Sequence, residues 1–304
     1  DGIFQLESSG MKSFMKELRP QNLEDVVSGI SLYRPGPMDF IPKYIQGKNH
    51  PEDVTYACPQ LEPILKPTYG CIVYQEQVMQ IVRDLAGYTL GRSDLVRRAM
   101  SKKKQAVMEK ERANFIYGNP EENVPGCIAN GIDEQTAGQI YDTMMDFAKY
   151  AFNKSHAACY AVVAYQTAYL KYYYPVEFMA ALMTSVIDNP KKVSEYILNC
   201  RNMNIAILPP DVNASQPEFS VETKDGKECI RFALEAIKSA GSEGCKSIVA
   251  ERDKDGPYKS LDELCSRIDI FQANKKTIES LTKAGALDSL LPDKDPKEAR
   301  AILL

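Results

Sequence analysis

A cationic stretch, GRSDLVRRAMSKKK, is the part of this sequence with the clearest chemistry. Within thirteen positions it carries six basic residues, which are Arg92, Arg97, Arg98, Lys102, Lys103 and Lys104. Asp94 is the one acid among them, and the whole chain has a formal net charge of -4. Local positive charge of this kind attracts phosphates and donates charge-assisted hydrogen bonds to them. The alternative is a solvated basic helix face, although such faces usually mix charges of both signs.

The element that must position this stretch is a helix. Ser93 suits its N-cap, and Asp94 suits the first turn, where a carboxylate meets the positive end of the helix. The inner face is expected to comprise Leu95, Ala99 and Met100. Arg97 and Arg98 would then point about 100° apart. They could reach two sides of one phosphate chain, or one could bind a ligand and the other the fold.

A second cationic motif, NKSH, stands where a long helix is expected to begin. Free backbone N–H groups and the helix dipole make such a position a ready anion site. Asn153 opens the motif, and Lys154 and His156 add side-chain donors. Tyr160 follows His156 by one turn. We therefore expect a second phosphate-binding element here, and the alternative for a lone histidine is a structural or surface role.

The helix after NKSH is apolar and aromatic on most faces, which is typical of a central, buried helix. Its helically spaced tyrosines are Tyr165, Tyr169, Tyr172 and Tyr173. We expect this face to lie in the core, with a base-stacking platform as the alternative. Arg34 stands in a stiff turn, YRPGPM, which is either a helix terminator or a rigid mount for a phosphate or base contact.

The composition is that of a globular protein with reduced thiols. The 304 residues, 44% of them hydrophobic, suffice for a large core or for a main domain with a smaller one. Neither a signal peptide nor an apolar run that could span a bilayer is evident. Eight cysteines without a CxxC pair and only two histidines argue against a zinc site and favour a cytoplasmic location. His50 receives no role, and both ends look like the interior of a longer chain.

The character of the sequence changes in its last third. Residues 217–234 alternate enough for a hairpin with Asp225-Gly226 as its turn. From residue 233 two stretches combine helix, glycine turn and helix, a pattern that presents backbone N–H groups to nucleic-acid phosphates. The expected DNA-backbone contacts are Lys103, Lys104, Lys238 and Gly241. The expected fold is mainly α, with a small β-hairpin and a C-terminal helix-hairpin-helix-like subdomain.

Six blocks, in order, carry a resemblance to a known family: FQLESSGMK, YRPGPM, PTYGCIVYQEQVMQI, GYTLGRSDLVRRAMSKKK, FAKYAFNKSHAACYAVVAYQTAYLK and ILPPDVN. With them the chain resembles the C-family replicative DNA polymerases of bacteria over nearly its whole length. The resemblance implies a multi-helix fingers domain at residues 1–205 and a connecting segment with the hairpin at 206–232. It implies a helix-hairpin-helix-like DNA-binding region at 233–304, truncated at its C-terminus.

In that family the fingers hold the triphosphate of the incoming nucleotide. The resemblance maps this role onto Arg97, Arg98 and His156, and His156 would either hydrogen-bond the triphosphate or protonate the leaving pyrophosphate. The implied helpers are Lys154 and Lys102–Lys104. The implied nucleotide or template contacts are Arg34, Asn153 and Tyr160. One departure is Ser239-Ala240-Gly241, where the family usually carries Gly-x-Gly, because losing a glycine restricts close backbone approach.

The resemblance implies a DNA-directed DNA polymerase, a nucleotidyltransferase, as the activity of the full-length protein. Its catalytic aspartates would hold two Mg²⁺ ions in a palm domain. The DKD pairs Asp253/Asp255 and Asp293/Asp295 lie in polar, lysine-flanked stretches and do not fit that role. Because phosphoryl transfer needs metal clamping of the developing charge, this segment alone is expected to be inactive.

The implied partners are primer–template DNA, the incoming dNTP, and the palm and thumb of the same chain, with the sliding clamp and other replisome subunits bound by regions outside this segment. A membrane is not among them. The alternative function is a non-catalytic DNA-binding or assembly module whose basic helix tracks the nucleic-acid backbone. Such a module would bind DNA in a salt-sensitive way that is indifferent to nucleotide. A self-contained phosphotransferase is disfavoured because the sequence has no Walker A loop.

Overall fold

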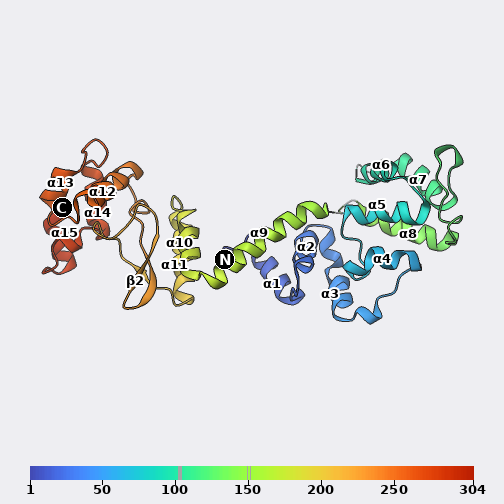
Figure 1. The fold of residues 1–304 in the computed structure, drawn as a ribbon, viewed down its shortest axis with the longest axis horizontal. Helices are drawn as coiled ribbons and strands as arrows, with labels where there is room; N and C mark the ends of the chain where they lie inside the picture. Colours follow the sequence, from blue (N-terminus) through green and yellow to red (C-terminus); the bar gives the residue numbers. More distant parts are fainter. Residues whose placement is uncertain (102–104, 149, 151) are drawn as a thin grey trace. The chain divides into compact units, whose positions relative to one another are not determined.

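The computed structural model describes residues 1–101, 105–148, 150 and 152–304. These residues form two compact units, one of Ile3–Gln166 and one of Asp1–Gly2 with Thr167–Leu304. Each unit is considered by itself (Figure 1). Within the described residues there are fifteen α-helices and one three-stranded sheet, so the predicted mainly α fold is confirmed.

In the unit of Ile3–Gln166 the regular elements that the structure describes are helices, joined by turns and by two isolated β-bridges. Its α-helices are α1 (Ser9–Leu18), α2 (Leu23–Leu32), α3 (Ile41–Asn49), α4 (Glu62–Leu65), α5 (Gln75–Ala86), α6 (Leu90–Ser101), α7 (Gln105–Tyr117), α8 (Glu134–Ala148) and the first part of α9 (Lys154–Tyr173). Its short 3-10 helices are η1 (Pro37–Phe40), η2 (Pro51–Asp53), η3 (Pro59–Leu61), η4 (Lys66–Thr68) and η5 (Pro120–Glu122). Residues 39–70, which are rich in proline, contain several of these helical segments.

Local side-chain caps explain where the first helices begin. The Ser8 side chain accepts from the backbone N–H of Met11 at the start of α1, and Asn22 accepts from Asp25 at the start of α2. Both caps satisfy N–H groups that a helix cannot bond internally.

The start of α6 was predicted wrongly. The helix begins at Leu90, and the hydroxyl of Thr89 accepts from the backbone N–H of Arg92. Ser93 lies inside the helix, where its buried hydroxyl donates to the Thr89 carbonyl. The inner face consequently contains Val96 and Ala99, whereas Leu95 is 65% exposed. Met100 has no described side chain.

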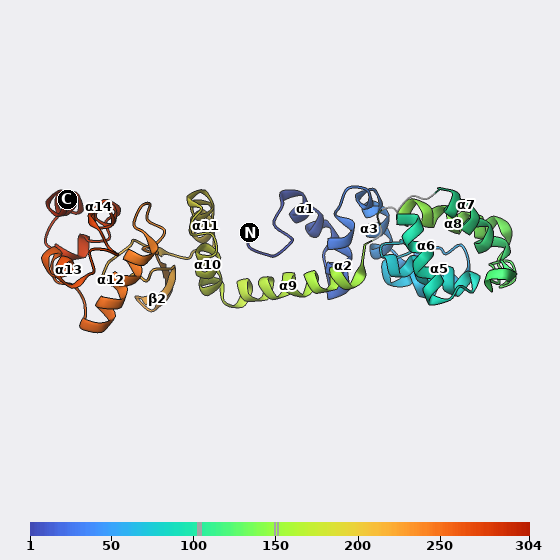
Figure 2. The same ribbon diagram turned by 90° about the horizontal axis from the view of Figure 1, so that it is seen from above.

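Two hydrophobic clusters hold this unit together. One lies among α5, α6, α7 and α8, which are neighbours in both views (Figure 1 and Figure 2), and includes Ile81, Phe115 and Met144. The other joins α1, α2 and α3 to residues 71–74 and to an alanine stripe on α9 (Ala157, Ala161 and Ala164). The stripe lets the backbone of α9 approach its neighbours closely.

The expectation that α9 is buried on most faces is wrong. Its fully buried residues in the described chain are the three alanines of the stripe. The tyrosine face is open, since Tyr165, Tyr169, Tyr172 and Tyr173 are all more than two-fifths exposed. Helical spacing established that these tyrosines share a face but not that the face is covered.

The other unit continues with α10 (Pro175–Thr184) and α11 (Pro190–Asn202), followed by a small sheet. The strands β1 (Ile207–Leu208), β2 (Ser220–Lys224) and β3 (Lys227–Arg231) have the order β1-β3-β2. β2 and β3 form the predicted antiparallel hairpin, and its turn residues Asp225 and Gly226 have φ angles of 52° and 73°. β1 pairs parallel to β3 and was not predicted.

The last four α-helices are α12 (Ser242–Asp255), α13 (Leu261–Arg267), α14 (Lys275–Ala284) and α15 (Pro296–Leu303), with η6 (Asp288–Leu290) between the last two. They enclose one hydrophobic cluster, whereas α10, α11 and the sheet enclose another. The helix expected directly before the first glycine turn is absent, since residues 234–239 form turns and bends. The domain limits at 205/206 and 232/233 remain proposals.

Candidate functional site

A hollow of about 600 Å³ opens where α9 begins, in the unit of Ile3–Gln166. The residues that line it are Phe4, Gln5, Glu7, Ser8, Met11, Ile30, Tyr33, Arg34, Phe152, His156 and Tyr160. Three candidates from the sequence, Arg34, His156 and Tyr160, therefore meet in one place. They come from the turn after α2 and from α9, more than one hundred residues apart.

Aromatic contacts order the wall of this hollow. The guanidinium of Arg34 lies 4.5 Å from the centre of the Phe152 ring, in cation–π geometry. The His156 ring lies 5.4 Å from Phe152 and 4.2 Å from Tyr160, and Phe4 contacts Tyr160 at 5.2 Å. Flat rings beside a cation can receive a flat, anionic or electron-rich ligand.

The arginine pair of α6 is bound to an acid of the same helix. Asp94 Oδ1 accepts from Nε and Nη2 of Arg97 at 2.9 and 2.6 Å, and its Oδ2 lies 2.7 Å from Nε of Arg98. The hydrogen bond from Arg97, followed by the charges of both arginines, lowers the pKa of the Asp94 carboxyl, which stays ionised at neutral pH. The two arginines differ in exposure, at 22% for Arg97 and 63% for Arg98.

Gln75 links α6 to the start of α9. Its side-chain oxygen accepts from Nη1 of Arg97 at 2.9 Å, and its backbone N–H donates to the carbonyl of Phe152 at 2.9 Å. The neighbouring residue, Tyr74, forms a parallel bridge with Phe152. A continuous set of contacts thus runs from Asp94 through Arg97 and Gln75 to the wall of the hollow.

The backbone groups at the start of α9 are already bonded, contrary to the expected open anion site. Both carboxylate oxygens of Glu76 accept from the N–H of Lys154 at 3.1 Å, and Asn153 caps the N–H of His156 at 2.8 Å. The Asn153 amide also donates to Glu76. The Lys154 ammonium pairs with Glu24 at 3.0 Å and is not among the residues that line the hollow.

Not every cation of the basic stretch is available for a ligand. Arg92 pairs with Glu111 at 2.8 Å and with Glu122, and it lies over the ring of Tyr88. Burial, followed by the Glu111 charge, raises the pKa of Tyr88. Arg92 therefore serves the fold. Lys102, Lys103 and Lys104 lie outside the described residues.

The first hairpin of the C-terminal region is open on its surface. Lys238 is exposed, and no atom lies within 4 Å of the position where a Cβ on Gly241 would stand. Gly241 precedes α12 without any side-chain cap on that helix. Ser239 and Gly241 both have positive φ, at 67° and 78°, so the backbone keeps a glycine-like shape although the first glycine is replaced.

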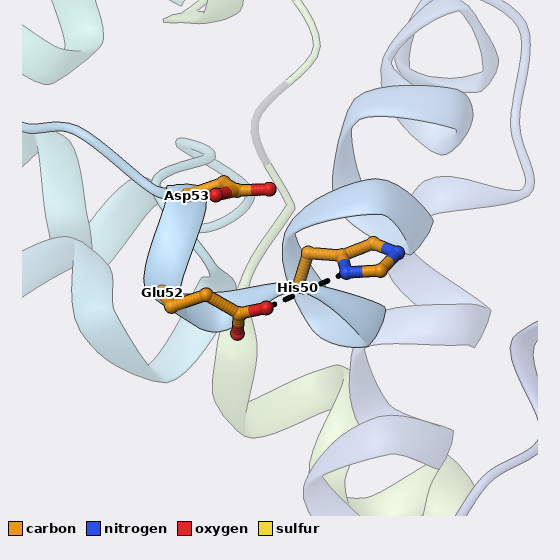
Figure 3. Close-up of side chains that lie close together, drawn as sticks. All are labelled: His50, Glu52 and Asp53. Carbon is orange, nitrogen blue, oxygen red and sulfur yellow. Dashed lines mark ion pairs between the residues drawn. The ribbon is translucent and has the colours of Figure 1, made fainter.

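One group of side chains in the described residues could share a metal ion: His50, Glu52 and Asp53. Figure 3 shows the His50 ring beside Glu52, with Asp53 next to Glu52 on the short helix η2. Nδ1 of His50 lies 3.5 Å from Oε1 of Glu52. All three are exposed, and they have no lining role at the hollow. Of the DKD residues, Asp253 pairs with Arg252, and the side chain of Asp295 caps α15.

The sequence is similar to known protein families and to individual proteins. Residues 1–123 match the family model of the bacterial DNA polymerase III alpha subunit finger domain, and residues 204–297 match a helix-hairpin-helix motif. The chain is 48% identical to DNA polymerase III subunit alpha of Chlamydia trachomatis over 294 residues, which is 97% of this chain and 23% of that protein. The chain belongs to the bacterial DNA polymerase III alpha subunit family.

Other members of the DNA polymerase III alpha subunit family are similarly close. The proteins of Thermus aquaticus and Pseudomonas aeruginosa are 47% and 46% identical, each over 95% of this chain and over 23% and 24% of their own lengths. The chain thus spans about a quarter of the relatives it matches. No helix in the described residues is both long and apolar enough to cross a membrane.

Phe152, Gln75 and Glu76 are among the residues of this site that the sequence did not point to. Phe152 stands directly before NKSH, and the other two stand inside the QEQ run of a block that resembles the family. The resemblance marked both blocks, but the structure reveals that they are neighbours, through the bridge between Tyr74 and Phe152 and the hydrogen bonds beside it.

Proposed function

We propose that the unit of Ile3–Gln166 binds the incoming dNTP during template-directed DNA synthesis by a bacterial DNA polymerase III alpha subunit. The observation that supports this most is the continuous set of contacts from the arginine pair, through Gln75, to the hollow lined by His156. A triphosphate can lie along such a surface, with its charge on the arginine side and its planar part on the aromatic side.

The two arginines have different roles in this proposal. Arg97 is held by Asp94 and Gln75 and keeps α6 in register with the start of α9. Arg98 is far more exposed, and its guanidinium meets the β- and γ-phosphates. His156 either hydrogen-bonds the triphosphate or protonates the leaving pyrophosphate, and Arg34 and Tyr160 contact the nucleotide or template. Lys154 and Asn153 support the helix start that carries His156.

Chemistry itself requires the remainder of the polymerase. Mg²⁺ would supply charge neutralisation at the transferring phosphate. The described residues near the hollow offer no carboxylate pair for it, so its ligands are expected in a palm domain outside this segment. The segment alone is expected to be inactive. The sliding clamp and other replisome subunits are expected to bind elsewhere on the protein, in the bacterial cytoplasm.

The test is single-nucleotide insertion by the complete polymerase that contains this segment. Arg98→Ala and His156→Ala should each lower kcat/KM for dNTP by tenfold or more, about 1.4 kcal/mol, while primer–template affinity holds. Arg112→Ala is the matched control, because Arg112 pairs with Asp142 away from the hollow. A loss of DNA affinity without a loss of dNTP use would overturn the assignment in favour of a module that tracks the backbone.

A second binding function has its own support. The family model of a helix-hairpin-helix motif covers the open hairpin at Gly241, so we propose that Lys238 and the N–H groups at the start of α12 contact duplex phosphates. DNA binding through this hairpin should be independent of dNTP. Salt-dependent binding by the complete polymerase, with and without dNTP, separates the two functions.

A further inference from the structure

The carboxylate of Asp94 forms ion pairs with both arginines of the proposed nucleotide site. It stands three and four positions before them on α6, a spacing that puts all three side chains on neighbouring parts of the helix surface. No ligand is needed for this arrangement, because the carboxylate supplies the acceptors that phosphate oxygens would otherwise supply.

The carboxylate does not hold the two arginines equally. Arg97 has bonds to two residues, Asp94 and Gln75, and is mostly covered. Arg98 has one ion pair in the described part of the chain and is 63% exposed. Exposed ion pairs are weak, so a multiply charged phosphate can replace the carboxylate at Arg98. The same exchange at Arg97 would also have to disturb its bond with Gln75.

We propose that Asp94 is an internal competitor for Arg98, which a triphosphate displaces on binding and which returns to Arg98 as pyrophosphate leaves. The inference rests on the proposed function, because it takes Arg98 as a triphosphate contact. Asp94 then weakens the binding of phosphate ligands to Arg98 by one common factor, and it favours release of the product.

The experiment uses the complete polymerase with Asp94→Asn, which retains the shape of the side chain and removes its charge. The inhibition constants of inorganic pyrophosphate and of a deoxynucleoside monophosphate should each fall about threefold to fivefold, the range expected for an exposed ion pair. Asp94→Glu retains the charge and should stay near the wild type. Asp142→Asn is the matched control, since it breaks an exposed pair with Arg112 and should leave both constants unchanged.

The opposite results overturn the proposal. Unchanged inhibition constants in Asp94→Asn would mean that the carboxylate does not compete. Raised constants and a raised KM for dNTP, as in Arg98→Ala, would mean that Asp94 positions Arg98 for its ligand. The proposed function has a separate failure, which is an Arg98→Ala variant with normal dNTP use. If Arg98→Ala impairs dNTP use and Asp94→Asn does not bind pyrophosphate more tightly, only the inference about Asp94 fails.

Discussion

At the start of α9, side chains of the protein already accept from the backbone N–H groups that could bind an anion, whereas no side chain caps the start of α12. Glu76 and the Asn153 side chain accept from the first N–H groups of α9. Gly241 has no side chain to cap α12, and no atom lies within 4 Å of the position that a Cβ on Gly241 would take. Both starts had been predicted to bind phosphates, yet they differ in what they can offer a ligand.

This difference separates two ways of binding nucleic acid or nucleotide. A capped helix can offer only its side chains, so α9 contributes His156 and Tyr160 to the hollow beside it. An uncapped helix can offer backbone N–H groups and its dipole, which recognise phosphates without regard to sequence. The first arrangement suits an oriented ligand, and the second suits a repeating backbone.

The largest contrast between the two starts is expected in thiol reactivity. Cys159 on α9 is exposed, whereas burial raises the pKa of Cys245 on α12 to about 12. Because the thiolate is the nucleophile, iodoacetamide at pH 8 should alkylate the exposed Cys159 at least about tenfold faster than the buried Cys245. Peptide mass spectrometry of the complete polymerase measures both rates. In urea the two should react alike, and similar rates in the native protein would contradict the burial of Cys245.

A smaller effect is expected when the cap of α9 is removed. Glu76→Ala should leave the Lys154 N–H without its acceptor and cost about 1–2 kcal/mol of local stability, as other lost caps do. Hydrogen exchange at the first turn of α9 should therefore accelerate roughly fivefold to thirtyfold. Glu76→Gln keeps an acceptor and should recover most of the protection. Glu243→Ala in the first turn of α12 is the control, since among the described residues the side chain of Glu243 bonds Lys246 and no backbone N–H. Equal acceleration in both variants would remove the contrast.

Ser239→Gly is expected to stabilise the open hairpin. A serine in the left-handed region costs about 1 kcal/mol that glycine does not pay, partly offset by the greater freedom of glycine in the unfolded chain. Exchange of the amides around Ala240 should slow about threefold. Ser247→Gly inside α12 serves as the comparison and should destabilise by about 0.5 kcal/mol. Faster hydrogen exchange of the hairpin in Ser239→Gly would contradict this expectation and show that the serine side chain stabilises the hairpin.

Lys238→Ala is expected to have the smallest effect. Loss of one phosphate contact should reduce the slope of log affinity against log salt by about one, uniformly across DNA sequences. Fluorescence anisotropy of labelled duplex at several salt concentrations measures the slope. Lys224→Ala, in the hairpin strand β2, is a matched surface change. An equal reduction in both variants would assign the effect to general charge.

The sequence predicted those features of the fold that depend on neighbours a few positions away. The Asp225-Gly226 turn is such a feature, because it acts within four residues. The prediction for the start of α6 was wrong because Thr89 and Ser93 are both good helix caps. Which of them caps the helix depends on the burial of Ser93 and Val96 in the fold. Periodicity alone could not establish which side of the helix the core covers.

The candidate site divides in the same way. The arginine pair and the NKSH motif are visible as local charge, and the family resemblance joins them. The residues that bond to these motifs are not visible in the sequence, since Glu76 is 78 positions from Lys154 and Gln75 is 22 positions from Arg97. A distant carboxylate can occupy a helix start as well as a phosphate can, and only tertiary structure reveals which of them is present.

The uncovered tyrosine face of α9 gives this chain an optical property. The chain contains 17 tyrosines and no tryptophan, so its ultraviolet emission comes from tyrosine alone. Tyr169 and Tyr173 lie 4.5 Å apart by their ring centres, close enough to exchange excitation, and Tyr172 is 80% exposed. A partner that covers this face would change the yield of that emission. The helix therefore carries its own fluorescent reporter, and no dye has to be attached to see it covered.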